Sequence, residues 1–99
     1  MSTPILVILN PASCSGRARR MARGVERILR DRGREFRLQL TEAPAHAVEL
    51  ARGAVEEGVE TVVAVGGDGT VHEVANGLLA ASGSSPGPEP GALPALAIV

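Results

Sequence analysis

Short apolar runs alternate with longer amphipathic segments along this chain. The apolar runs predict four strands, at about residues 5–9, 35–40, 61–65 and 95–99. Between the strands, apolar residues recur at helical spacing in three segments. Because strands and helices alternate, the pattern indicates a parallel sheet with right-handed crossovers. We therefore predict an α/β fold, with a Rossmann-like three-layer arrangement in which helices cover both faces of a parallel sheet.

Glycines mark the ends of the first two predicted helices. The first helix carries its apolar residues within 18–29 and is followed by Gly33, and the second covers about 45–57 and is followed by Gly58. Glycine is common after helices because it adopts the left-handed conformation that closes them. These two stops separate each helix from the strand that follows it.

The third helix has a different set of signals. Thr70 and Glu73 have the spacing of a capping box, which predicts a helix that begins at Thr70. Gly77 interrupts this helix at a cost of about 1 kcal/mol relative to alanine. Either another segment approaches Gly77 closely, or the glycine is exposed and tolerated. Residues 82–92, which are mostly Ser, Gly and Pro, predict a flexible surface loop.

The turn Gly66-Gly67-Asp68-Gly69-Thr70 joins the third strand to the third helix. Glycines let the backbone approach a ligand closely, and the first N–H groups of a helix have no partner within the helix. A turn of this composition at a helix start is suited to binding phosphate.

Asp68 adds an electrostatic constraint to this turn. Two like unit charges about 4 Å apart cost about 4 kcal/mol at an effective dielectric constant of about 20. A carboxylate beside a phosphate therefore needs a cation between them, or a hydroxyl whose proton it accepts. Both arrangements predict Mg²⁺-dependent phosphoryl transfer, with Asp68 as catalytic residue and metal ligand. The alternative is that Asp68 only caps the helix.

Composition excludes several other chemistries. All ten basic residues are arginine, so the chain lacks the lysine of a Walker A motif, a protein-kinase strand or a Schiff base. The single cysteine, Cys14, excludes an internal disulfide and a cysteine-cluster zinc site. With 99 residues, 44% of them apolar, the chain can form one small core. No apolar run is long enough to cross a membrane, and we therefore expect a cytoplasmic protein.

The net charge of −1 conceals two oppositely charged segments. Residues 17–37 hold nine arginines and three acids, a balance of +6, whereas residues 38–99 hold one arginine and eight acids, a balance of −7. Nucleic acid is a poor partner because aromatic residues do not accompany the positive charge and the acidic segment repels a phosphate backbone. One face of the first helix either rests on an anionic membrane or is simply solvated. This face consists of Arg20, Arg23, Arg27, Arg30 and Arg34.

Three loops rich in hydroxyls, amides and glycines follow the first three strands, at residues 10–16, 41–44 and 66–70. The carboxyl ends of parallel strands meet at one edge of the sheet, and ligands bind at that edge. Three such loops together predict a nucleotide site there. His46, at the start of the second helix, is interpreted as an ordinary surface or loop-contact residue, with a metal or base role as the alternative.

The sequence resembles the diacylglycerol kinase and sphingosine kinase catalytic domain over nearly its whole length. The resemblance rests on Asn10-Pro11-x-Ser13 and on the glycine turn continued as Glu73-Val74-x-Asn76-Gly77-Leu78. The glycine motif alone is also found in NAD kinases and, loosely, phosphofructokinases, whereas the Asn-Pro start and the helix continuation favour the lipid kinases. The resemblance implies an N-terminal domain that binds ATP and Mg²⁺ and a following β-sandwich domain that holds the lipid.

The resemblance also implies roles for individual residues. Asn10, Pro11 and Ser13 would line the nucleotide pocket, and Thr41 would lie near the ribose or phosphates. Further cofactor contacts are implied for Gly66, Gly67, Asp68, Gly69, Thr70, His72 and Glu73. Cys14 stands where the family usually has glycine, so that its Cβ crowds the ligand or moves the loop, and His72 stands where asparagine is frequent.

Together these features predict that residues 1–99 are the N-terminal, nucleotide-binding part of an ATP-dependent lipid kinase. The full-length enzyme would transfer the γ-phosphoryl group to a hydroxyl of a diacylglycerol-like lipid. We expect the lipid-binding domain to follow the fourth strand, and the fragment alone to be inactive. The alternatives are an NAD-kinase-like phosphotransferase and a non-catalytic nucleotide-binding module. Peripheral contact with the inner membrane face and a homo-oligomer are left open.

Overall fold

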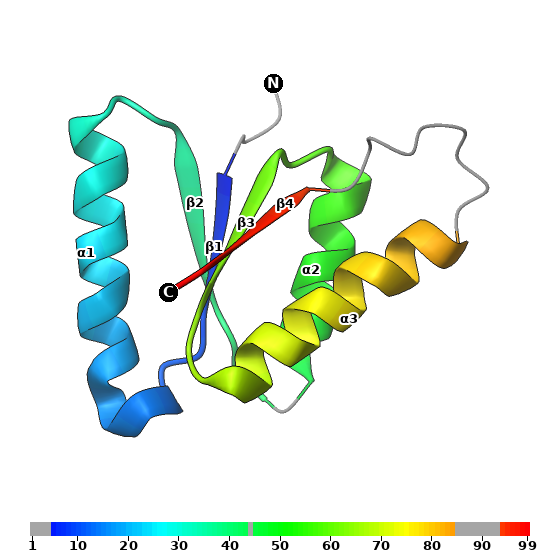
Figure 1. Cartoon of the computed structure of the whole chain (residues 1–99), viewed down its shortest axis with the longest axis horizontal. Coiled ribbons are helices and arrows are strands. Elements are labelled where there is room, and N and C mark those ends of the chain that lie inside the picture. The colour runs from blue at the N-terminus through cyan, green and yellow to red at the C-terminus, as the bar shows by residue number, and fades with distance from the viewer. Residues whose placement is uncertain (1–4, 44, 85–93) are drawn as a thin grey trace.

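Figure 1 shows the computed structural model, which describes residues 5–43, 45–84 and 94–99. Four strands lie where the apolar runs predict them. They are β1 (Ile5–Leu9), β2 (Phe36–Leu40), β3 (Thr61–Val65) and β4 (Ala95–Ile98). A short 3₁₀ turn, η1 (Ser13–Gly16), leads into the first of the helices. These are α1 (Arg17–Asp31), α2 (His46–Glu57) and α3 (Asp68–Ser84).

The four strands form one parallel sheet in the order β2-β1-β3-β4. In the centre, β1 pairs with β2 on one side and β3 on the other, so that Leu9 lies between Leu40 and Val65. The chain therefore moves outward from β1 to β2, then returns past β1 to β3. In open α/β sheets, ligands bind outside the carboxyl ends of the strands where the strand order reverses in this way. Here that position lies between β1 and β3.

Helices cover both faces of the sheet, as the three-layer prediction requires. In Figure 1, α1 lies on one side of the sheet, and α2 and α3 lie on the other. The β1 side chains alternate between the two cores: Leu6 and Ile8 pack toward α2 and α3, whereas Ile5, Val7 and Leu9 pack toward α1. Burial on both faces explains why β1 is an unbroken apolar run rather than an alternating one.

Small residues bring α2 and α3 close together. Gly77 of α3 is buried, and a Cβ at this position would collide with the backbone oxygen of Val48 and lie 2.8 Å from the Cβ of Ala51. Ala47, Ala51 and Ala54 are the fully buried residues of α2. Of the two explanations for Gly77, a close approach by another segment is therefore confirmed.

The start and end of α3 differ from the predictions. The N–H groups of Thr70 and Val71 both donate to the carbonyl oxygen of Gly67, at 3.0 and 3.2 Å, so the helix begins at Asp68. The hydroxyl of Thr70 is buried without a partner in the described structure, so the predicted capping box is wrong. At the other end, buried Ala81 anchors a last turn that continues to Ser84, so the loop prediction is wrong for 82–84. Residues 85–92 of that predicted loop lie outside the described part.

Substituting Gly77 by alanine tests the contact between α2 and α3. Because the new Cβ overlaps a backbone oxygen, we expect Gly77→Ala to lower the free energy of unfolding by about 1–3 kcal/mol. Gly53→Ala in α2 is the matched control, since its Cβ would meet nothing within 4 Å, and it should raise stability by about 0.5–1 kcal/mol. Urea unfolding followed by circular dichroism measures both. Equal shifts of the same sign would contradict the close packing.

Candidate functional site

Backbone hydrogen bonds tie the carboxyl ends of β1, β2 and β3 together. The N–H of Asn10 donates to the carbonyl oxygen of Val65 at 3.0 Å, linking the chain after β1 to the end of β3. The N–H of Thr41 donates to the carbonyl oxygen of Leu9 at 2.8 Å, linking the chain after β2 to the end of β1. The loops that the sequence placed at one edge of the sheet therefore start from a single, hydrogen-bonded platform.

The loop after β1 is folded by the side chain of its first residue. Asn10 Oδ1 accepts a hydrogen bond from the N–H of Ala12, and the carbonyl oxygen of Asn10 accepts one from the N–H of Ser13, both at 3.1 Å. Asparagine favours turns because its side chain can accept in this way from the backbone two residues on. The turn brings Ser13 beside the loop that follows β3. Asn10 thus shapes its own loop, a role that the sequence did not predict.

The glycines of the turn after β3 have different surroundings. A Cβ at Gly66 would collide with Thr70 Oγ1, lie 2.8 Å from Thr70 Cβ and lie 3.2 Å from Ser13 Oγ. At Gly67 and Gly69 a Cβ would meet nothing within 4 Å, and neither residue has a positive φ. Packing within the fold therefore requires glycine at position 66 but not at 67 or 69.

Thr70 places an unpaired hydroxyl at the start of α3. The residue is 4% exposed, and its Oγ1 has no hydrogen-bond partner in the described structure. Leaving a buried hydroxyl unpaired costs about 1–3 kcal/mol, and such groups often mark the place of a ligand or water atom. It lies in the first turn of a helix whose free N–H groups favour an anion. Thr70 is therefore suited to contact a bound anion.

Asp68 and His72 are both exposed. Asp68 is the first residue of α3, where an acidic side chain stabilises the helix by about 0.3–1 kcal/mol through its interaction with the helix dipole. A capping role and a ligand role are therefore compatible at this position. No group of three or more His, Cys, Asp or Glu residues in the described chain could hold a metal ion. A cation here would need ligands from a bound phosphate or water as well as from Asp68.

A cavity of about 550 Å³ opens at the same edge of the sheet. It is lined by Asn10, Pro11, Ala12, Thr41, Glu42, Ala43 and Glu73. The structure thus brings four of the sequence-predicted site residues together around one space: Asn10, Pro11 and Thr41 from the loops after β1 and β2, and Glu73 from α3. The glycine turn, Ser13, Thr70 and His72 are not part of this lining. The side chain of Cys14 lies outside the described part of the structure.

Sequence reasoning missed how His46 shapes this cavity. The N–H of Glu42, in the cavity wall, donates to His46 Nδ1 at 2.9 Å. His46 is the first residue of α2, so this bond fastens the loop after β2 to the helix that follows. Nδ1 can accept only when it carries no proton. The four-residue separation at a predicted helix start was the available signal, and the interpretation of His46 as a loop-contact residue is confirmed.

Comparison with known proteins identifies the family. Residues 4–99 match the model of the diacylglycerol kinase catalytic domain. The chain belongs to this family.

Three relatives illustrate how this chain compares with longer members of the diacylglycerol kinase family. Human sphingosine kinase 1 is 40% identical over 76 residues, which cover 76% of this chain and 20% of that protein. A Citrobacter koseri protein named Probable lipid kinase YegS-like is 37% identical over 94 residues, 95% of this chain and 28% of its own length. A diacylglycerol kinase crystal structure from Bacillus anthracis str. Sterne shares the fold, with a TM-score of 0.68 at 22% identity, covering 99% of this chain and 32% of that one. The chain therefore spans less than a third of each.

Removing the imidazole of His46 tests its part in the cavity wall. In His46→Ala the N–H of Glu42 loses its acceptor, and we expect its hydrogen exchange to become about fivefold faster, which corresponds to a net loss of about 1 kcal/mol. His46→Asn keeps a side-chain acceptor and should restore part of the protection. His72→Ala, an exposed histidine on α3, is the control. If the hydrogen exchange of the Glu42 N–H is unchanged in His46→Ala, its hydrogen bond to His46 has no structural role.

Proposed function

We propose that this chain is the N-terminal, nucleotide-binding part of a lipid kinase. With the domain that we expect to follow it, the full-length protein transfers the γ-phosphoryl group of ATP to a hydroxyl of a diacylglycerol-like lipid. Family membership supports a lipid kinase over an NAD-kinase-like phosphotransferase. The observation that carries the nucleotide assignment is the open space over Gly67 and Gly69, at the start of α3.

The two open glycines leave room for a ligand at the start of α3. Neither position has a left-handed backbone, and both have room for a Cβ in the structure itself. A phosphate chain that rests against this backbone would need that room, because glycine allows close approach. The same place offers the free N–H groups of the α3 start and the unpaired Thr70 hydroxyl. We assign the phosphates of ATP to it.

The cavity beside this turn suits the rest of the nucleotide. Its volume of about 550 Å³ falls in the range of about 300–1,000 Å³ typical of small-molecule sites. Asn10, Pro11 and Thr41 approach it from the loops after β1 and β2, and Glu73 approaches it from α3. We assign the nucleoside to this space. Ser13 lies beside the glycine turn, with its Oγ 3.2 Å from the position of a Cβ at Gly66.

Asp68 fits the needs of a magnesium ion that arrives with ATP. Mg²⁺ is usually held by one or two carboxylates together with substrate phosphates and water, not by a cage of protein ligands. Asp68 is exposed beside the proposed phosphate position and can therefore take such a role without a cluster of acids around it. The ion would neutralise charge on the transferring phosphoryl group. Asp68 would be its protein ligand, and the phosphates and water would supply the rest.

Gly69→Ala separates nucleotide binding from stability. Since its Cβ meets nothing in the structure and the residue lies in α3, we expect the free energy of unfolding not to fall and to rise by up to about 1 kcal/mol, as for Gly53→Ala. In a site occupied by phosphate, the same Cβ intrudes on the ligand, and affinity for Mg·ATP should fall at least about tenfold, equivalent to 1.4 kcal/mol. Isothermal titration of the full-length protein measures the affinity, with Gly53→Ala as control. If Gly69→Ala binds Mg·ATP with wild-type affinity, the assignment of the phosphates to this turn is wrong.

Asp68→Ala tests the catalytic assignment in the full-length protein. Loss of the metal-holding carboxylate should lower kcat by about 10²–10³-fold, the usual effect of removing one group that stabilises transition-state charge. The assay is Mg·ATP-dependent phosphorylation of diacylglycerol and of sphingosine in mixed micelles. Glu60→Ala, an exposed acid just before β3 at the opposite edge of the sheet, should leave the rate unchanged. Undiminished turnover in Asp68→Ala would exclude this residue from the mechanism.

A further inference from the structure

The outer surface of α1 carries an unusual density of positive charge. In Figure 1, α1 lies alone on its side of the sheet, and its outward surface faces away from the other described elements. Five exposed arginines, which we call the arginine face, lie along it: Arg19, Arg20, Arg23, Arg27 and Arg30. Because α1 ends at Asp31, Arg34 lies beyond the helix, which corrects its predicted place in this face.

Most of the arginine face has no acidic partner in the described structure. Glu26 pairs with Arg30 at 3.8 Å, and the guanidinium of Arg30 also lies 5.9 Å from the centre of the Phe36 ring. The remaining ion pair of the described residues joins Arg37 of β2 to α2, away from this surface. Arg19, Arg20, Arg23 and Arg27 therefore present their charge to the surroundings.

Three of these charges repel one another within the helix. Arg19, Arg23 and Arg27 follow one another at intervals of four residues, and like charges at this spacing destabilise a helix by about 0.2–0.5 kcal/mol per pair. The buried residues of α1 are Ala18 and Ala22, so the arginines are not needed for packing. A row of repelling charges that the fold does not use is stabilised when an anionic surface covers it.

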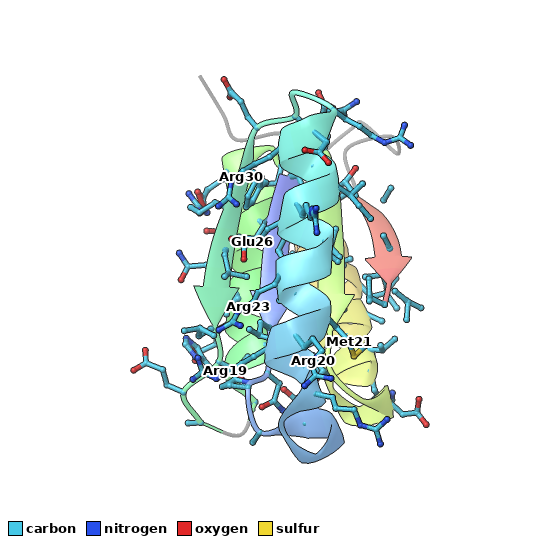
Figure 2. The ribbon with its side chains drawn as sticks, turned by 90° about the vertical axis from the view of Figure 1, so that its left-hand side faces the viewer. Arg19, Arg20, Met21, Arg23, Glu26 and Arg30 are labelled. Atoms are coloured by element: carbon cyan, nitrogen blue, oxygen red, sulfur yellow. The ribbon has the colours of Figure 1, made fainter. Side chains whose placement is uncertain are left out.

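The shape of the helix suits an extended, flat partner. Fifteen residues make a helix about 22 Å long. Figure 2 shows Arg19, Arg23 and Arg30 along one side of it and Met21 on the other. On the flank away from the arginines, Ile28 is 56% exposed and Met21 is partly exposed. Arginines beside exposed apolar side chains are the pattern of a helix that lies at a membrane interface.

We propose that the arginine face docks the protein on an anionic phospholipid bilayer. This inference rests on the proposed function, because a lipid acceptor is presented by a bilayer. Among the described residues, no helix has the length and apolar character needed to cross that bilayer. Nucleic acid fits this face less well because Phe36, the sole aromatic residue, packs against the inner side of α1. The opposite layer carries exposed Glu49 and Glu56, which an anionic surface repels.

Sedimentation with vesicles tests the docking surface in the full-length protein. The probes are vesicles of phosphatidylcholine with 30% phosphatidylglycerol, and pure phosphatidylcholine vesicles, without nucleotide. We expect binding to the anionic vesicles only, weakened by salt. Each arginine near such a surface contributes about fivefold in affinity, so Arg23→Gln with Arg27→Gln should weaken binding about 25-fold. Arg52→Gln, an exposed arginine on the opposite layer, is the control and should bind like wild type.

Three outcomes would overturn the inference. The first is that the wild type fails to bind the anionic vesicles. The second is that the double variant binds them as tightly as the wild type. The third is that duplex DNA or poly-glutamate binds this face at 150 mM salt while vesicles do not. Phosphorylation of diacylglycerol in micelles is measured in parallel, so that failure of the docking surface can be told apart from failure of the kinase proposal. A protein that phosphorylates the micellar lipid without binding vesicles contradicts only the docking surface. A protein that phosphorylates no lipid contradicts the proposed function.

Discussion

The burial of β1 on both faces is the constraint on which this structure depends. Every residue of the strand is buried, and its side chains alternate between two cores. One helical layer cannot cover both faces, so α1 packs on one side and α2 with α3 on the other. The chain must then leave β1 in one direction and return past it to β3. That reversal puts the loops after β1 and β3 side by side, and the candidate site follows from it.

Within that site, packing and ligand binding make separate demands on neighbouring residues. Gly66 has no room for a side chain because Thr70 and Ser13 occupy the space, whereas Gly67 and Gly69 face open space. Thr70, in turn, is buried with an unpaired hydroxyl, an arrangement that lowers stability. The glycine turn therefore combines a structural contact with a surface that the fold leaves unfilled, as functional sites often do.

The charge asymmetry of the chain becomes a spatial one in the fold. The basic segment includes α1, which covers one face of the sheet, and the acidic segment includes α2 and α3, which cover the other (Figure 1). A small domain with layers of opposite sign acquires a preferred orientation near a charged surface, because one layer is attracted while the other is repelled. The net charge of −1 does not reveal this separation of charge between the two layers.

The sequence by itself determined the elements, the parallel α/β fold and the family, because apolar periodicity and glycine stops are local signals and the glycine turn is a contiguous motif. It also placed Asn10 and Thr41 near one edge, whereas the contact predicted for Glu73 followed from the family resemblance. Only the tertiary structure decided that α3 begins at Asp68, that Gly77 touches α2 and that His46 holds the loop after β2. The Gly77 contact depends on a distance between segments that packing alone brings together, and the other two depend on the local backbone path, which decides which N–H meets which acceptor. A linear pattern records neither of these geometries.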